Sequence, residues 1–384
     1  MVAGTRAAVA KAEAEKEIEE DALYLAAPLS HAALLLLAVA PMVMGVEANF
    51  NILATATLAV FAGAHRSVRP VAAGHTEAMT KQDAMRFPII GSCVLFSFFL
   101  LFKFLPKDLV NKILTGYFVL LGLVALTATM APVLGRCMPK SVALRQMYLG
   151  VLPKIPFITD APQRVEPTVA EMLSGAVSVG FCAWYILEKH WLANNALGMV
   201  FALQGIEFLS LDSIQVGAIL LTGLFFYDIF WVFCTPVMVT VAKSFDAPIK
   251  LLFPRALDAA SVPFSMLGLG DIVIPGIYVA LALRMDRARA AAAAAAAQPA
   301  PASYFPAVVG GYFTGLATTI VIMNVFHAAQ PALLYIVPGV LGATFLRALA
   351  AGEVRSIWGY SENDDGSGEG GEAEVQGEDS KKVK

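Results

Sequence analysis

Charged residues are scarce in most of this 384-residue chain, although its two ends are rich in them. Only 15% of the residues are charged and 58% are hydrophobic, and the mean hydropathy is +0.69. Residues 1–21 hold nine charges and residues 353–384 hold thirteen, so the middle is about one-tenth charged, against about one-quarter in soluble domains. This composition indicates a membrane protein. The net charge of −3 and the scattered basic residues give no support for a nucleic-acid partner.

Paired cysteines and metal-binding motifs are also lacking. The four cysteines lie far apart and form no CxxC pair, which argues against a disulfide framework and a zinc site. The five histidines form no HExxH motif, so a zinc metalloprotease is not supported. No Asn-x-Ser/Thr sequence is present to accept a glycan on a lumenal loop. We therefore expect no metal ion and no organic cofactor.

Apolar runs of about 20 residues, the length that crosses a hydrocarbon core of about 30 Å, recur along the chain. Because lipid cannot satisfy backbone polar groups, such runs must be helices. The sequence predicts an all-α polytopic membrane protein with about nine transmembrane helices, in an N-terminal group (49–187) and a catalytic group (192–350). A further run at 27–46, after a polar segment at 1–26, is consistent with a span, an interfacial helix or an unusual signal sequence. The nine runs lie near 49–64, 88–105, 113–135, 169–187, 192–209, 214–241, 262–284, 307–327 and 332–350.

Positive residues are distributed unevenly between alternate loops. Loops 65–87, 136–168 and 285–306 hold about eleven Lys and Arg, whereas the opposite loops hold about six. The positive-inside rule places the first set, and with it the C-terminal tail, on the cytosolic side. Glu207, between two spans, is expected to face water.

Two segments are predicted to have no fold of their own, the Ala/Pro-rich linker at 287–303 and the acidic tail at 351–384. The chain ends in KKVK, and the spacing of Lys381 and Lys382 from the C-terminus resembles the dilysine signal that retrieves membrane proteins to the endoplasmic reticulum (ER). The alternative is an ordinary charged terminus. Retrieval requires a cytosolic tail, as the loop count predicts, and it would place this multi-pass protein in the ER membrane.

Two aspartates interrupt the apolar runs, where a charged side chain costs about 2.5 to 3.5 kcal/mol. Asp228 lies about halfway along one run, and Asp271 lies near the middle of the next. Consecutive spans are antiparallel, so at about 1.5 Å per residue the two acids should differ in depth by about 6 Å or less. We therefore expect them to meet. Taken singly, a membrane aspartate is more often a proton relay or a packing hydrogen bond.

A pair of carboxyl groups in a low-dielectric site shares one proton. Aspartic proteases use such a pair: the ionised member takes a proton from water and the protonated member donates to the scissile carbonyl. Gly268 and Gly270 would let another backbone approach Asp271, and Pro275 leaves the carbonyl of Asp271 without its helical donor. The helix is expected to be loosened there. Free backbone groups would then hold an unwound peptide by strand-like pairing.

Three motifs carry a family resemblance: YD at 227–228, GLGD at 268–271 and QPALLY at 330–335. In order and spacing they resemble the signatures of the signal peptide peptidase family, the presenilin-like GxGD intramembrane aspartic proteases. The segments RFPIIGS, KHWLANN and SMLGLGDIVIPGI extend the resemblance over most of residues 49–355. It looks strongest toward plant and algal ER members.

The resemblance implies a presenilin-like fold with nine spans, a lumenal N-terminus and a cytosolic C-terminus. The run at 27–46 departs from that pattern and leaves the side of the N-terminus open. The implied activity is cleavage of transmembrane segments in the bilayer, mainly remnant signal peptides and type II membrane anchors. Homo-oligomers and partners in ER-associated degradation are left open. The implied site comprises the catalytic Asp228 and Asp271, the supporting Tyr227, Gly268 and Gly270, and the PAL motif, Pro331, Ala332 and Leu333.

Two other classes of protein fit parts of the pattern. A proton- or cation-coupled transporter or channel would explain paired acids and a broken helix. It would not explain the three motifs, and no internal repeat is evident. A membrane assembly or degradation factor without catalytic activity would keep the fold. Cleavage of a helical peptide in detergent, without an ion gradient, separates the protease from both.

Overall fold

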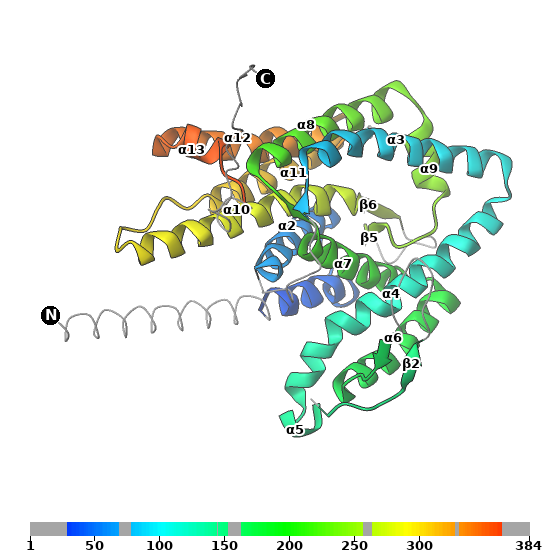
Figure 1. The fold of residues 1–384 in the computed structure, drawn as a ribbon. Coiled ribbons are helices and arrows are strands. Elements are labelled where there is room, and N and C mark those ends of the chain that lie inside the picture. Colours follow the sequence, from blue (N-terminus) through cyan, green and yellow to red (C-terminus); the bar gives the residue numbers. More distant parts are fainter. Residues whose placement is uncertain are drawn as a thin grey trace, which may run out of the picture.

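The computed structural model describes residues 29–68, 78–143, 145–152, 163–255, 263–326 and 330–362, and it is mostly helical (Figure 1). The helices are Leu29–Val43, α2 (Ala48–Ser67), α3 (Lys81–Phe104), α4 (Lys107–Cys137), α5 (Lys140–Ala143), α6 (Val169–Glu188), α7 (Trp191–Phe208), α8 (Ile214–Ile229), the π-helix η1 (Phe230–Cys234), α9 (Val237–Ser244), α10 (Gly270–Ala295), α11 (Phe305–Phe326), α12 (Leu333–Ala351) and α13 (Val354–Trp358). The strands are β1 (Ala78–Met79), β2 (Gly150–Leu152), β3 (Gln163–Val165), β4 (Ser210–Leu211), β5 (Lys250–Pro254) and β6 (Phe264–Gly268).

Six helices of the described residues are long and apolar enough to cross a membrane: α3, α4, α6, α8 with η1, α11 and α12. The predicted polytopic helical fold is therefore confirmed. Each of the nine predicted runs contains a helix, but α2, α7 and α10 are not among these six, so the count of nine stays a prediction. Large apolar side chains of α3, including Ile89, Val94 and Leu101, are exposed, as expected of a helix that faces lipid.

Several helices begin at side chains that satisfy their first backbone N–H groups. Thr80 before α3 and Thr168 before α6 accept from the backbone N–H of Asp83 and Glu171, whose carboxylates accept from the threonine N–H in return. Ser213 accepts from the third N–H of α8. These local signals define where the spans start.

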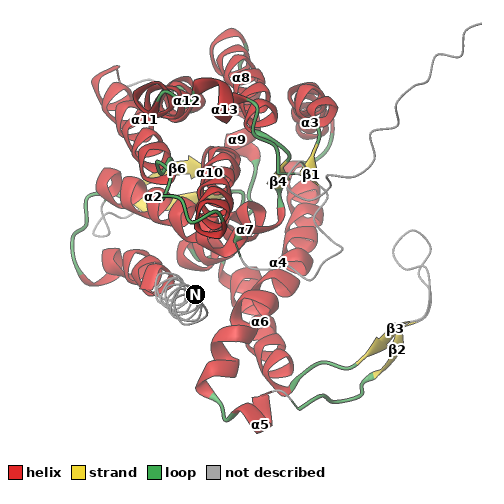
Figure 2. Cartoon of the chain, turned by 60° about the vertical axis from the view of Figure 1, so that its left-hand side comes forward, coloured by secondary structure: helices red, strands yellow, loops and turns green. Residues whose placement is uncertain are grey.

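Helix α10 lies at the centre of the bundle, among α2, α7, α8, α11 and α12 (Figure 2). Its residues 275–283 are buried almost completely. Glycines permit this packing: a Cβ on Gly276 of α10 would lie 2.6 Å from Ile206 of α7, and one on Gly63 of α2 would lie 2.8 Å from the same side chain. Small residues thus let three helices close around one isoleucine.

The loops between consecutive helices form two sets, which alternate along the chain and should lie on opposite sides of the membrane. Loops of the same set contact one another. On one set, β1 pairs with β4, and Arg284 hydrogen-bonds both Ser67 and Glu362. On the other set, Asn111 hydrogen-bonds the carbonyl of Ser244. This arrangement agrees with helices that cross the membrane alternately, while the side that faces the cytosol stays a prediction.

The segment at 287–303 differs from the expected unfolded linker. Helix α10 continues through it to Ala295, because a run of alanines has the highest helix propensity. Arg289 also pairs with Glu353, and Asp286 accepts from the backbone N–H of Phe305 at 2.8 Å at the start of α11. The tail predicted at 351–384 is folded at its start, because α13 (Val354–Trp358) lies within it and Glu362 pairs with Arg284. The polar segment at 1–26, the tail beyond residue 362 and its two lysines, Lys381 and Lys382, lie outside the described residues.

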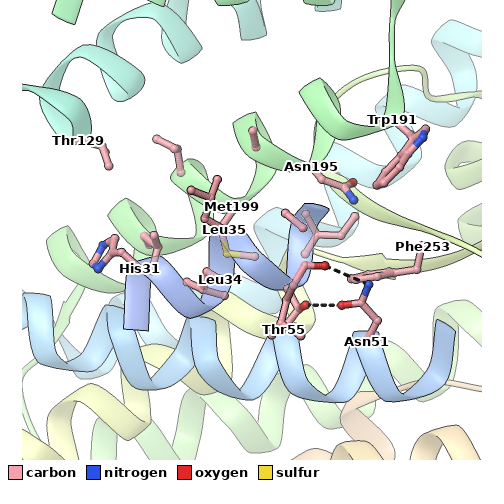
Figure 3. Close-up of a pocket in the computed structure, with 16 residues that line it drawn as sticks. His31, Leu34, Leu35, Asn51, Thr55, Thr129, Trp191, Asn195, Met199 and Phe253 are labelled. Carbon is pink, nitrogen blue, oxygen red and sulfur yellow. Dashed lines mark hydrogen bonds between the residues drawn. The ribbon is translucent and has the colours of Figure 1, made fainter. Parts of the chain in front are cut away.

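The described part of the uncertain run at 27–46 is the helix Leu29–Val43, whose 15 residues rise about 22 Å. It packs beside α2, where Asn51 donates to the carbonyl of Leu37 at 3.3 Å. With α2, α7 and β5 it encloses an apolar cavity of about 190 Å³ that neither Asp228 nor Asp271 lines (Figure 3).

Glu207 does not face water as expected. It forms an ion pair with Arg66, whose Nε lies 2.7 Å from Glu207 Oε2, and both side chains are largely buried. Burial is tolerated because each charge is matched by the other. The pair fastens the end of α7 to the end of α2.

Candidate active site

Asp228 is the last residue but one of α8 and is only 3% exposed. Its Oδ2 accepts a hydrogen bond of 3.0 Å from the backbone N–H of Leu333, the first residue of α12. The PAL motif therefore meets the YD motif through a backbone donor at a helix N-terminus, where the helix dipole favours a carboxylate. The π-helix η1 begins directly after α8, and such helix defects are frequent at functional sites.

The sequence predicts that Asp271 lies near the middle of a membrane-spanning helix, and this prediction is wrong. Strand β6 ends at Gly268, and α10 begins at Gly270, so Asp271 is in the first turn of α10. The apolar run at 262–284 is thus part strand and part helix, a distinction that hydropathy cannot make. Asp271 is partly exposed.

The carboxyl groups of Asp228 and Asp271 lie within range of direct electrostatic interaction. Both acids lie at helix N-termini, Asp228 at that of α12 and Asp271 at that of α10, so two partially positive helix ends face the pair. Among the described residues, no cluster of three or more His, Cys, Asp or Glu side chains is arranged to hold a metal ion. The site is therefore an acid pair set against backbone donors.

The two glycines of GLGD have different surroundings. A Cβ at Gly268 would lie 3.3 Å from Oδ2 of Asp271, so a side chain there would crowd the carboxyl group. A Cβ at Gly270 would face open space, and Gly270 itself is exposed. The first glycine makes room for the acid, and the second leaves the approach to it free.

Pro275 does not loosen α10, contrary to expectation, because the helix is continuous from Gly270 to Ala295. The carbonyl of Asp271, which lacks its helical donor because of Pro275, accepts a hydrogen bond of 3.2 Å from the hydroxyl of Tyr312 on α11. Pro275 itself indicates in the sequence that the helical donor is missing. Nothing in the sequence indicates that the Tyr312 hydroxyl takes the place of that donor.

The strands β5 and β6 form an antiparallel hairpin that leads directly to Asp271. Its outer edge on β5 is occupied by Asn195 of α7, which donates to the carbonyl of Leu252 and accepts from its N–H, both at 2.7 Å. Asn194 donates to the carbonyl of Lys250 at 2.8 Å. Two side-chain amides thus take the place of a neighbouring strand. Within the described part of the chain, β6 pairs only with β5.

The remaining predicted residues contact neighbouring helices. The ring of Tyr227 packs 6.3 Å from that of Trp231, whose Nε1 donates to Ser92 on α3. The carbonyl of Ala332 accepts from Thr319 of α11 at 3.4 Å. Trp231 therefore joins η1 to α3, and Ala332 joins the start of α12 to α11, while Pro331 precedes the first turn of α12.

This fold and site define a polytopic helical membrane protein that holds an acid pair beside a β-hairpin. A family model described as signal peptide peptidase matches residues 72–364. The chain belongs to the signal peptide peptidase family, and it is an intramembrane protease.

Named relatives agree with this assignment. Signal peptide peptidase of Homo sapiens is 44% identical, over 82% of this chain and 83% of the relative. A probable intramembrane protease of Schizosaccharomyces pombe is 32% identical, over 81% of this chain and 94% of the relative. Signal peptide peptidase-like 1 of Oryza sativa subsp. japonica is 27% identical, over 73% of this chain and 82% of the relative. These relatives give no support to the transporter alternative, and the expected nearness to plant and algal ER members stays a prediction.

Proposed function

We propose that this protease is an aspartic endopeptidase whose catalytic residues are Asp228 and Asp271. The proposal is supported by the position of each acid at a helix N-terminus, Asp271 in the first turn of α10 and Asp228 accepting from Leu333 of α12, within electrostatic range of one another. A pair that shares one proton holds both a base and an acid at once. No cofactor is needed for this chemistry.

In the proposed reaction, the ionised carboxylate takes a proton from a water molecule, whose oxygen forms a bond to the scissile carbonyl carbon. The protonated carboxyl gives its proton to the carbonyl oxygen, so a neutral gem-diol results. The carboxyl group that took the water proton then gives it to the nitrogen as the C–N bond breaks, and the other carboxylate takes a proton from one hydroxyl of the gem-diol as the carbonyl re-forms. The products are a new carboxyl group and a new amine, and the pair regains its shared proton.

The substrate is proposed to bind as an added strand on the free edge of β6. A helical peptide must be unwound before its amide can be attacked, and its free backbone groups then need partners in the membrane. The outer edge of β5 is occupied by Asn194 and Asn195, whereas β6 has a partner only on β5 among the described residues. Because β6 ends three residues before Asp271, a peptide on this edge is delivered to the acid pair.

The substrates proposed are remnant signal peptides and type II membrane anchors within the ER bilayer. The relatives named signal peptide peptidase support this substrate class. A cytosolic C-terminus is proposed from the excess of Lys and Arg on loops 65–87, 136–168 and 285–306. Retrieval to the ER by Lys381 and Lys382 is proposed from their spacing at the terminus.

The experiment is cleavage of a synthetic signal-peptide helix by the purified protein in detergent, with wild type, Asp228→Asn and Asp271→Asn compared. Each substitution keeps the shape of the side chain and removes its acid, so both variants should fold and neither should cleave. Matching thermal unfolding curves provide the control for folding. Cleavage by either variant at the wild-type rate would refute the acid pair, and absence of cleavage by the folded wild type on several substrates would favour a protein without protease activity.

A further inference from the structure

The peptide group of Asp271 is held from outside its own helix. In a regular helix its carbonyl would accept from the N–H of residue 275, but Pro275 has none. The hydroxyl of Tyr312 on α11 donates to this carbonyl at 3.2 Å instead. Tyr312 is completely buried, so bulk water cannot take over this role.

We propose that Tyr312 is a positioning residue that orients Asp271 for catalysis through its backbone. This inference rests on the proposed role of Asp271 as one of the two catalytic acids. The hydroxyl fixes the orientation of the peptide group between Asp271 and the next residue. It thereby restricts the direction in which the Asp271 carboxyl group points toward Asp228. Tyr312 is not itself proposed to touch the substrate or the reacting atoms.

Helix α11, which carries Tyr312, packs closely against α12. Gly311, the neighbour of Tyr312, lies so close to α12 that a Cβ on it would be 2.3 Å from the carbonyl oxygen of Gly339. The same helix α12 provides the N–H that binds Asp228. Tyr312 and Leu333 thus orient the two acids from one tightly packed helix pair, Tyr312 holding Asp271 and Leu333 holding Asp228.

Tyr312→Phe removes only the hydroxyl and leaves the ring in place. We expect kcat for the synthetic signal peptide to fall about 10- to 100-fold, the effect of a small misplacement of a catalytic group. KM should change less than about threefold, because the hydroxyl does not line the free edge of β6 where the peptide is proposed to bind. A general loss of folded protein would instead lower the active fraction and the thermal stability together.

Tyr278→Phe is the matched control. Tyr278 lies on α10, is also buried, and its hydroxyl lies 3.3 Å from Thr344 Oγ1, away from the acid pair. Both substitutions remove one buried tyrosine hydroxyl from the interior of the same helix bundle. We expect Tyr278→Phe to match the thermal stability change of Tyr312→Phe while leaving kcat within about threefold of wild type.

Pro275→Ala provides a rescue. Alanine restores an N–H at position 275, which can donate to the Asp271 carbonyl within α10. Tyr312→Phe should therefore reduce kcat much less in the Pro275→Ala background than in the wild type, which a double-mutant cycle measures directly.

Three results decide the proposal. A kcat for Tyr312→Phe equal to that of Tyr278→Phe overturns it, as does a cycle in which Pro275→Ala gives no rescue. A selective fall in kcat that Pro275→Ala relieves supports it. Asp271→Asn in the same assay tests the proposed function separately: if that variant still cleaves, the role of Asp271 is wrong whatever the Tyr312 variants show.

Discussion

The backbone N–H of Leu333 donates a hydrogen bond of 3.0 Å to Oδ2 of Asp228, a residue 105 positions earlier in the chain. Leu333 is the first residue of α12, so the position of this donor depends on how α12 packs against α11. That packing depends on glycine: a Cβ at Gly315 of α11 would lie 2.6 Å from Cα of Ile336. The separation of two helices thus sets a hydrogen bond at the acid pair.

Gly315→Ala should displace α12 from α11 and move Leu333 away from Asp228. The new methyl group meets backbone atoms, which cannot rotate away as a side chain can, so we expect a loss of stability of about 1 to 3 kcal/mol. Cleavage per folded molecule should fall at least about tenfold. Thermal unfolding in detergent and cleavage of the synthetic signal peptide measure the two effects.

Gly310→Ala is the control for this substitution. Gly310 is on the same helix, and a Cβ there meets nothing within 4 Å. Alanine favours helix over glycine by about 1 kcal/mol, so this variant should be as stable as wild type or slightly more stable, and it should remain active. Equal cleavage by the two alanine variants would contradict the dependence of the acid pair on the spacing of α11 and α12.

Asn195→Ala should weaken the β-hairpin that precedes Asp271. Two hydrogen bonds to the backbone of Leu252 are lost, both of 2.7 Å, and we expect a destabilisation of about 2 kcal/mol. Because the peptide is proposed to pair with β6, a loosened hairpin should raise KM for the synthetic peptide about tenfold, equivalent to about 1.4 kcal/mol. Initial rates over a range of peptide concentrations provide this KM.

Asn111→Ala offers a comparison with the same chemistry. Asn111 also bridges backbone groups of another segment, donating to the carbonyl of Ser244 at 3.0 Å and accepting from the N–H of Asp246 at 3.2 Å. It should destabilise the protein similarly but leave KM unchanged. If both variants change KM alike, the effect follows from stability alone and the role of the hairpin edge in binding is wrong.

The sequence predicts that Asp228 and Asp271 approach one another, because depth in the membrane can be counted along apolar runs. It predicts the wrong local structure for Asp271, since strand and helix are equally apolar at 262–284. Pro263 precedes the short strand β6, Gly268 ends it and Gly270 follows it, and these residues are the only local sign of the strand in the sequence.

Contacts between distant segments are beyond a reading of one sequence. The hydrogen bond from Tyr312 to Asp271 and the pairing of Asn195 with Leu252 join positions 41 and 57 apart. A tyrosine or an asparagine in an apolar run does not identify its hydrogen-bond partner, because many different partners could satisfy its polar group. The motif KHWLANN singles out Asn195 through the family resemblance, but the motif does not say what the Asn195 side chain binds. The structure shows that it binds the backbone of Leu252.

Glu353 should make the stability of the C-terminal helices depend on pH. Burial acts to raise the pKa of Glu353, but hydrogen bonds from Arg289 and Tyr304 outweigh it and hold the pKa below its usual value. A lowered pKa means that the folded state binds fewer protons than the unfolded state. The stabilisation is therefore present above about pH 4.3 and is lost as the pH falls through the pKa of the folded state.

Glu353→Gln should accordingly lower the free energy of unfolding by up to about 1 kcal/mol at pH 7, and the difference from wild type should shrink as the pH falls below about 4.3. Thermal unfolding in detergent between pH 3.5 and about 8 measures it. The exposed Glu166, changed to Gln, is the control and should give a much smaller difference. A gap for Glu353→Gln that stays constant down to low pH would show that the ion pair is not its source.

Lys381 and Lys382 are predicted to retain the protein in the ER. Their side chains stand four and three residues from the C-terminus, the spacing of a dilysine signal, whereas Lys384 is the terminal residue and lies outside that spacing. With a fluorescent tag placed at the N-terminus so that the terminus stays free, Lys381→Ala combined with Lys382→Ala should shift the protein from the ER to later compartments. Lys384→Ala removes one positive charge from the same tail, against two in the double variant, and should leave the protein in the ER. ER residence that is unchanged in the double variant would show that the two lysines are not needed for retention, and loss of residence in Lys384→Ala as well would show that overall tail charge, not spacing, is recognised.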